Sequence, residues 1–278
     1  MEKKLNSLII SFFVLTTLSV VMFAAVSVLG VIYENPAELI EETEDSELAV
    51  LGNPTDPTLA STNDFGQKYI DKIIFLGEST TYGLQRYGVL TGGEQTVNVW
   101  TGAATKNGRI VSAGTMSLSP TIASTRIFYP DNGTALTVSE AVKLKAPEYL
   151  VITLGLNNGA SYYSERDFKH CYRLLLDSIL AAGTDTKIIL QSIFPVSRRC
   201  EIKAYTPKRL DECNSWVRDL AEEYGIKYLN TAETLRDDDG YLLEEYNNGG
   251  DGVHLNKQGL EAVIFYIRTH GYGEIYEN

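Results

Sequence analysis

Short apolar runs recur along residues 67–278, and stretches with helical periodicity lie between them. The runs are residues 72–77, 96–100, 149–155, 187–192 and 226–229. Continuous runs of this length that contain β-branched residues are typical of parallel strands covered on both faces. Because helices separate the strands, we expect an α/β fold, a three-layer α/β/α sandwich with a mostly parallel sheet.

Helix signals support the same alternation. Apolar side chains recur at helical spacing over residues 168–179. A Thr-Pro pair predicts the start of a second helix, over residues 206–224, because proline suits the first helical position. Asn256 can cap a last helix over residues 257–269. Residues 101–137, rich in Gly, Thr and Ser, predict no particular element.

Three short motifs adjoin these elements. They are Gly77-Glu78-Ser79-Thr80-Thr81-Tyr82-Gly83, Gly155-Leu156-Asn157-Asn158 and Asp251-Gly252-Val253-His254. Ser79 and Asn157 each directly follow a predicted strand, and His254 lies in the loop before the last helix. Ligands of open parallel sheets bind beyond the carboxyl ends of the strands. The three motifs are therefore expected to converge at one edge of the sheet.

The residue types in these motifs suit acyl transfer from an ester. Ser79 supplies a nucleophile, and its own N–H can donate to an oxyanion. Asp251, three positions before His254, can fix the imidazole tautomer and make His254 a general base. The side-chain amide of Asn157 is a second oxyanion donor. Each motif alone also fits a helix cap or a tight turn. The interpretation as an acyl-transfer site therefore depends on all three motifs occurring together in this order.

Over about residues 70–270 the chain resembles the SGNH or GDSL-type hydrolases, which are lipase-like acylhydrolases. The Gly-Asp-Ser block of that family corresponds to Gly77-Glu78-Ser79, and its Gly-x-Asn-Asp block to Gly155-Leu156-Asn157-Asn158. The Asp-x-x-His block corresponds to Asp251-Gly252-Val253-His254. The resemblance implies a flavodoxin-like fold, a Ser79–His254–Asp251 triad and no cofactor.

Two positions depart from the family pattern, and one block is assigned by resemblance alone. Glu78 replaces the usual Asp, outside the triad, and Asn158 replaces the Asp that supports the oxyanion loop in the family. The second block of the family supplies a glycine N–H to the oxyanion hole. Gly102 is the best match for it, and Gly114 is its rival.

Composition and residue spacing exclude nucleic acid and metal ions as expected partners. The net charge is −12, and no basic patch with interleaved aromatic residues occurs, so nucleic acid is not an expected partner. The three histidines and three cysteines lack the spacing of metal ligands, so no metal is expected. A disulfide between Cys200 and Cys213 stays open as a possibility. Tyr82, Trp100, Tyr162 and Tyr163 lie near the predicted loops and either stack on sugar rings or pack in the interior.

The N-terminal segment predicts a membrane anchor. Residues 5–33 are uncharged, and at about 1.5 Å per residue they are long enough to cross a hydrocarbon core of about 30 Å. Lys3 and Lys4 precede this stretch and acidic residues follow it, which places the remainder outside the cytoplasm. A cleaved signal peptide is the alternative, although its apolar region is usually only about 7–15 residues.

These features give a domain plan and a function. Residues 1–33 form a cytoplasmic tip and anchor, residues 34–66 an acidic flexible stalk without Lys or Arg, and residues 67–278 the hydrolase domain. We expect a membrane-tethered, extracytoplasmic serine esterase that hydrolyses short-chain or O-acetyl esters, including those of cell-surface polysaccharides. The alternatives are an O-acetyltransferase with the same triad and a non-catalytic binding module on the hydrolase fold.

Overall fold

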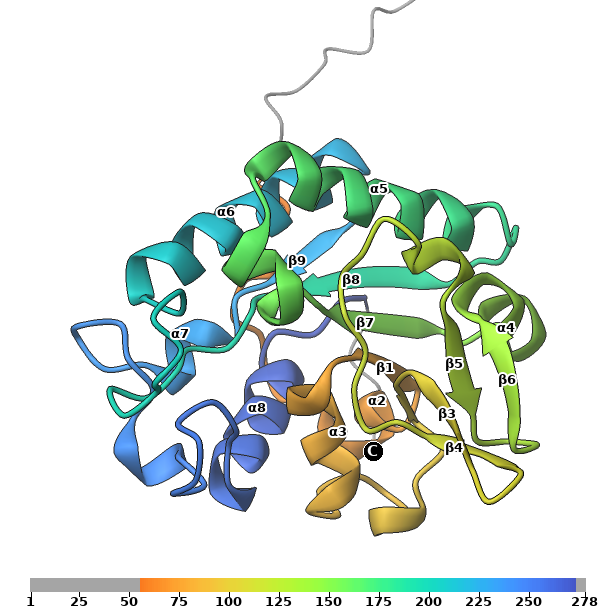
Figure 1. Ribbon diagram of the computed structural model, residues 1–278, viewed down its shortest axis with the longest axis horizontal. Coiled ribbons are helices and arrows are strands. Elements are labelled where there is room, and N and C mark those ends of the chain that lie inside the picture. The colour runs from red at the N-terminus through yellow and green to blue at the C-terminus, as the bar shows by residue number, and fades with distance from the viewer. Residues whose placement is uncertain (1–55, 274–278) are drawn as a thin grey trace, which may run out of the picture. The chain divides into compact units, whose positions relative to one another are not determined.

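The computed structural model describes residues 56–273, which form one five-stranded sheet with helices on both faces (Figure 1). The strands are β1 (Ile73–Gly77), β2 (Val99–Trp100), β7 (Tyr149–Thr153), β8 (Lys187–Gln191) and β9 (Lys227–Leu229). Their order is β2-β1-β7-β8-β9, and every neighbouring pair is parallel. In chain order this is 2-1-3-4-5, the flavodoxin-like arrangement of doubly wound sheets. The expected α/β fold with a mostly parallel sheet is confirmed.

The sheet is buried on both faces, which explains why its strands are continuously apolar. Ile74 and Leu150 face a core with α4 (Val138–Lys145), α5 (Glu165–Leu180) and α6 (Pro207–Glu223). Phe75 and Val151 point the other way. They pack in a second core with the helices α2 (Gly66–Ile70), α3 (Ser79–Arg86), α7 (Ala232–Leu235) and α8 (Lys257–Arg268). Successive strand residues thus serve opposite cores.

The helix starts expected from capping residues are confirmed. The side chain of Thr206 accepts a hydrogen bond from the backbone of Arg209, and Pro207 is the first residue of α6. The side chain of Asn256 accepts one from the backbone of Gly259 at the start of α8. Both caps satisfy N–H groups that have no partner inside the helix. Because α8 follows the His254 loop directly, its cap also fixes where that loop ends.

Residues 101–137, which the sequence left unassigned, form two antiparallel hairpins. The first pairs β3 (Ala103–Lys106) with β4 (Arg109–Ser112), and the second pairs β5 (Arg126–Tyr129) with β6 (Thr134–Thr137). Asn107 and Gly108 join β3 to β4 with φ of 50° and 74°, as a two-residue hairpin turn requires. The remaining short elements are η1 (Gly93–Gln95), η2 (Ile122–Ser124), η3 (Leu156–Ala160) and η4 (Glu244–Tyr246).

The start of the packed domain lies before residue 67, which corrects part of the expected stalk. Thr58 pairs with Tyr228 of β9, and the Leu59 N–H donates to the Tyr228 carbonyl at 2.8 Å. Leu59 and Phe65 are buried against the core. The edge strand β9 offers backbone groups for pairing, so the segment at Thr58 and Leu59 can join it, while Phe65 packs at the start of α2, where its N–H donates to the Arg268 carbonyl.

The other N-terminal predictions concern the membrane anchor and the first part of the stalk. The predicted anchor, residues 1–33, and residues 34–55 of the predicted stalk lie outside the described residues. Among the helices of residues 56–273, none combines the length and the apolar character that a membrane span needs.

Candidate active site

Ser79 begins α3 immediately beyond the carboxyl end of β1. Glu78 has an extended conformation, with φ of −87° and ψ of −163°, and Ser79 is the first helical residue. Its N–H therefore has no acceptor within the helix and is available to an oxyanion. The turn needs glycine at residue 77, since a Cβ atom there would lie 2.2 Å from the Thr81 hydroxyl oxygen and 2.6 Å from the Thr153 carbonyl oxygen.

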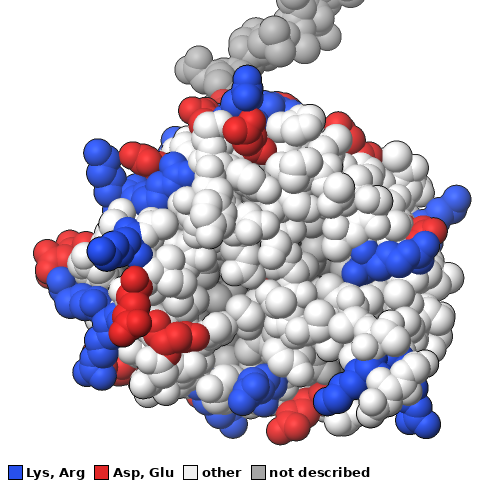
Figure 2. All heavy atoms as spheres, in the orientation of Figure 1, with Lys and Arg blue, Asp and Glu red and all other residues white. Residues whose placement is uncertain are grey.

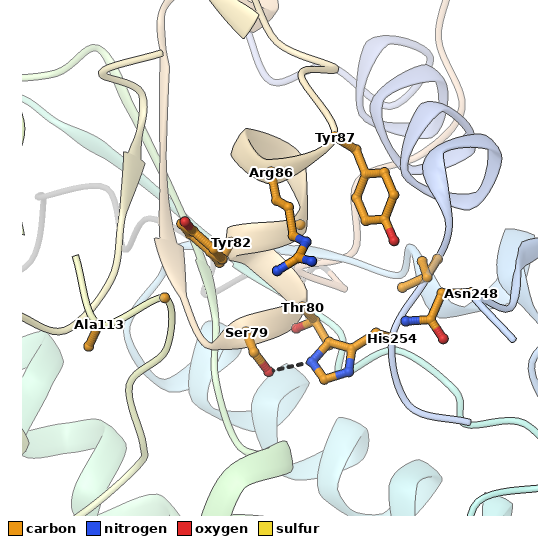
Figure 3. A pocket seen from close by; sticks show the side chains of 11 residues that line it. Ser79, Thr80, Tyr82, Arg86, Tyr87, Ala113, Asn248 and His254 are labelled. Carbon is orange, nitrogen blue, oxygen red and sulfur yellow. Dashed lines mark hydrogen bonds between the residues drawn. The ribbon is translucent and has the colours of Figure 1, made fainter. Parts of the chain in front are cut away.

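The structure brings Ser79, His254 and Asp251 into one hydrogen-bonded chain. His254 Nε2 lies 2.8 Å from Ser79 Oγ (Figure 3). His254 Nδ1 lies 2.6 Å from Asp251 Oδ2. With a carboxylate on Nδ1, the neutral imidazole carries its proton there and leaves Nε2 free to accept the serine proton.

Asp251 is itself fixed by backbone groups of its own loop. Its Oδ1 atom accepts the N–H of Val253 at 2.8 Å and that of His254 at 3.1 Å. Partial burial raises the pKa of Asp251, but the hydrogen bonds from Val253 and His254 outweigh burial and hold the pKa below its ordinary value. The carboxylate is therefore charged at neutral pH, as its contact with an imidazole N–H requires.

The Gly155–Asn158 loop lies against the nucleophile loop through Glu78. The Glu78 side chain is 2% exposed, and its two oxygens accept the N–H of Leu156 at 2.8 Å and that of Asn157 at 2.6 Å. Burial raises the pKa of Glu78, and although the backbone N–H groups of Asn157, Leu156 and Gly155 lower it, the net pKa is raised to about 8. The sequence interpretation treated Glu78 only as a replacement outside the triad and missed this link. The signal that could have indicated this link was the presence of a carboxylate residue directly before the nucleophile.

Further contacts hold the same loop. Tyr205 donates its hydroxyl to the Leu156 carbonyl at 2.9 Å, and Arg209 donates Nε–H to the Ala160 carbonyl at 3.0 Å. Asn158, with φ of 66°, donates its amide to the Leu118 carbonyl at 3.2 Å. The asparagine at this position therefore still ties the loop to a neighbouring segment.

The amide of Asn157 points into the loop of residues 115–116. Its Nδ2 atom donates to Thr115 Oγ1 at 3.1 Å and to the Met116 carbonyl at 3.1 Å. Asn157 lines the same hollow as Ser79 and Thr115. To stabilise an oxyanion, one of its N–H groups has to turn from Thr115, whose hydroxyl can rotate, to the substrate oxygen.

Gly102 does not occupy the position expected of the second block. Its N–H donates to the Thr115 carbonyl at 2.9 Å, and its carbonyl accepts the N–H of Ala113 at 2.7 Å. Its N–H is thus already bonded to the loop that passes Ser79, and Gly102 lines neither hollow beside Ser79, which corrects the assignment. The rival Gly114 does line a hollow with Ser79, and its N–H donates to Ser112 Oγ at 2.9 Å.

Two hollows meet at Ser79. One, of about 400 Å³, lies along α3 and includes Tyr82, Arg86 and His254 (Figure 3). The other, of about 550 Å³, lies on the Asn157 side and includes Thr115 and Tyr162. Figure 2 shows few charged side chains in the middle of this face of the molecule and many at its rim. Ser79 thus lies where the α3-side hollow meets the Asn157-side hollow, on a largely uncharged face.

The aromatic residues singled out from the sequence divide between these hollows and the interior. Tyr82 lines the first hollow, and Tyr162, which is 81% exposed, lines the second. Trp100 is fully buried and packs near Tyr129, so it cannot contact a ligand. Tyr163 is partly buried and donates its hydroxyl to the Leu118 carbonyl at 3.3 Å. The cysteines at 171, 200 and 213 are free thiols, so the Cys200–Cys213 disulfide is not formed.

The sequence of residues 75–262 matches the GDSL-like Lipase/Acylhydrolase family. The chain belongs to this family. Membership identifies it as an ester-hydrolysing enzyme, which confirms the resemblance found in the three motifs. No curated protein is similar enough in sequence to count as a match.

Several solved structures are similar to this chain, and the first of them reaches a TM-score of 0.50. A candidate platelet activating factor from Streptococcus pneumonia has 18% identity and a TM-score of 0.50, over 71% of this chain and 82% of that one. A candidate lipolytic protein of the G-D-S-L family from Desulfitobacterium hafniense has 14% identity and a TM-score of 0.48, over 70% of this chain and 97% of that one. A carbohydrate acetylesterase from Sinorhizobium meliloti has 12% identity and a TM-score of 0.43, over 70% of this chain and 95% of that one.

Proposed function

We propose that this GDSL-like acylhydrolase is a serine esterase with Ser79 as nucleophile, His254 as general base and Asp251 as the group that orients the imidazole. The observation that carries the proposal is the unbroken chain of short contacts, 2.8 Å from Ser79 Oγ to His254 Nε2 and 2.6 Å from His254 Nδ1 to Asp251 Oδ2. A packing serine has no need of a histidine that is itself oriented by a carboxylate.

The reaction follows from these contacts in two halves. The Ser79 Oγ–H proton passes to His254 Nε2 as Oγ bonds to the ester carbonyl carbon, whose oxygen becomes an oxyanion. The N–H of Ser79 and the amide of Asn157 stabilise that charge. When the intermediate collapses, the C–O bond to the alcohol breaks and the alcohol oxygen takes the proton from Nε2. Water then repeats the sequence on the acyl-enzyme and releases the acid.

The lining of the Asn157-side hollow favours small, polar substrates. Its walls include the hydroxyl residues Thr115, Ser117 and Ser161 and the exposed ring of Tyr162. A long acyl chain would need a continuous apolar surface, which these hydroxyl groups interrupt. This supports short-chain or O-acetyl esters, and an extracytoplasmic location would make acetylated cell-surface polysaccharide the substrate class.

The location of the reaction is part of the same proposal. It depends on residues 1–33, where Lys3 and Lys4 precede the uncharged stretch and acidic residues follow. With that topology the hydrolase domain faces the cell surface. Protease added to intact cells should release the domain, whereas full protection under conditions that admit the protease would reverse the topology.

A panel of esters tests the activity. We expect the full chain to hydrolyse acetyl and propionyl nitrophenyl esters faster than octanoyl esters, and to release acetate from O-acetylated glycans. Added sugar alcohols should not accumulate as acetylated products, because such products would indicate an O-acetyltransferase. A folded chain that turns over none of these esters would contradict the proposal and favour a binding module.

A further inference from the structure

Arg86 is a cation inside the hollow next to the nucleophile. Ser79, Tyr82 and Arg86 lie on one face of α3, because residues three to four positions apart line up along a helix. Seven residues span about 10.5 Å along the axis, and helical side chains lean toward the N-terminus. Figure 3 shows the Arg86 side chain extending from α3 toward Ser79 and His254.

Arg86 has no counterion within residues 56–273. Most other surface arginines in this part of the chain form ion pairs, for example Arg173 with Glu223, Arg198 with Asp237 and Arg236 with Asp211. Among the described residues that line the hollow, none is an Asp or a Glu. An anion that enters the hollow therefore meets a guanidinium that no carboxylate neutralises. In a chain with a net charge of −12, this unneutralised positive charge has the opposite sign to the chain as a whole.

The direction of proton transfer decides which part of an ester reaches Arg86. The leaving alcohol oxygen has to take its proton from His254 Nε2, so the alcohol part lies on the His254 side of Ser79. His254 and Arg86 line the same hollow, whereas Asn157 lines the other one. The oxyanion thus forms on the Asn157 side, and the alcohol part extends along α3.

We propose that the α3-side hollow binds an anionic group, a carboxylate or a phosphate, on the alcohol part of the ester, with Arg86 as its ligand. This inference rests on the proposed serine esterase function. The guanidinium presents paired N–H donors that match the oxygens of either anion. Tyr82 and Tyr87 flank it, and Asn248 adds an amide to the same wall. A volume of about 400 Å³ accommodates a group the size of one sugar ring.

The test uses acetyl esters of phenols that carry either an anionic or a neutral group at the same ring position. The probes are 4-acetoxybenzoate, 4-acetoxyphenyl phosphate and the neutral isostere 4-acetoxybenzamide, hydrolysed by the full chain. We expect kcat/KM for at least one anionic ester to exceed that for the amide by about tenfold, mainly through KM, because Arg86 contacts the anion before and during the reaction. The two anionic probes distinguish a carboxylate site from a phosphate site.

Variants connect the preference to Arg86. Arg86→Gln removes the charge at similar length, and the ratio of anionic to neutral kcat/KM should fall to about one. Arg86→Lys keeps the charge without the paired donors and should retain part of the ratio. Arg109→Gln is the matched control, since Arg109 is exposed on β4, lines neither hollow and has no ion pair within residues 56–273. It should keep the wild-type ratio.

The outcomes separate this inference from the activity itself. Hydrolysis of all three esters with equal kcat/KM would overturn the anion site and leave the esterase standing. A preference that survives in Arg86→Gln would also overturn it. Binding of the products 4-hydroxybenzoate and 4-hydroxybenzamide, measured by NMR titration, needs no turnover. If the chain hydrolyses none of the esters, the esterase proposal fails, while selective and Arg86-dependent binding of the benzoate would still support the anion site.

Discussion

Replacement of Asp251 by Asn is the most informative perturbation of the candidate triad. The two ends of the Asp251 carboxylate have different partners. Oδ1 accepts two backbone N–H groups, from Val253 and His254, whereas Oδ2 faces only His254 Nδ1. An asparagine will keep its oxygen at the end with two donors, since an NH₂ group there would oppose both of them. Its amide N–H then points at Nδ1.

This orientation of the introduced asparagine amide determines how much kcat should fall. An N–H donor opposite Nδ1 favours the tautomer that carries its proton on Nε2, and that proton faces Ser79 Oγ at 2.8 Å. Nε2 can then no longer accept the serine proton. Loss of the correct tautomer in a serine triad lowers kcat by about 10⁴-fold, which corresponds to about 5 kcal/mol of transition-state stabilisation. KM should change much less, because Asp251 does not line either hollow.

The assay compares initial rates of acetyl ester hydrolysis by the wild type, Asp251→Asn, His254→Ala and the double variant. Asp185→Asn, at an exposed position outside both hollows, controls for the change of charge. The double variant should be little slower than His254→Ala, because the two residues act as one unit. Losses that multiply, or an Asp251→Asn enzyme that keeps more than about a tenth of the wild-type kcat, would refute the reasoning.

Three further predictions concern the loops around Ser79. Asn157→Ala should lower kcat by about 10²–10³-fold in ester hydrolysis, as loss of one oxyanion donor does, and an unchanged kcat would remove Asn157 from the oxyanion hole. Between pH 4.5 and about 8 the folded protein should bind a proton at Glu78 that the unfolded chain has lost. The free energy of unfolding should therefore fall as pH rises, by up to about 1.4 kcal/mol per pH unit, and Glu78→Gln should flatten that slope in denaturant titrations. Gly155→Ala should lower the free energy of unfolding by about 2 kcal/mol or more, since φ is 121° and the added Cβ would lie 2.8 Å from the Phe168 ring; a wild-type unfolding midpoint would contradict this.

Local patterns were enough to predict the frame of the fold and the residues of the candidate triad. The strands are apolar on both faces and therefore stand out in the sequence, and the caps Thr206 and Asn256 mark helix starts by their chemistry. Parallel strands share a carboxyl edge, so placing Ser79 and Asn157 after strands was enough to bring them together.

The parts that the sequence did not reveal depend on contacts between distant residues. Glu78 meets the backbone of residues 156 and 157 only after β1 and β7 have paired. Gly102 seemed suitable because it follows β2. The β3–β4 hairpin, whose Asn107-Gly108 turn the sequence interpretation overlooked, comes next, so the loop that lines the hollows beside Ser79 begins only at residues 113–115. Residues 57–66 look polar, and only the pairing of Thr58 with β9 and the contact of Phe65 with Arg268 in α8 show that Leu59 and Phe65 belong to the core.

The central claim is that Ser79 is the nucleophile of an esterase. Labelling of the full chain with a serine-reactive phosphonate, followed by peptide mass spectrometry and acetyl ester assays on the same sample, tests it most directly. We expect one adduct, on the peptide that contains Ser79, formed in proportion to the loss of hydrolysis, and neither adduct nor turnover in a folded Ser79→Ala variant. An adduct at another serine, or wild-type turnover by Ser79→Ala, would contradict the assignment.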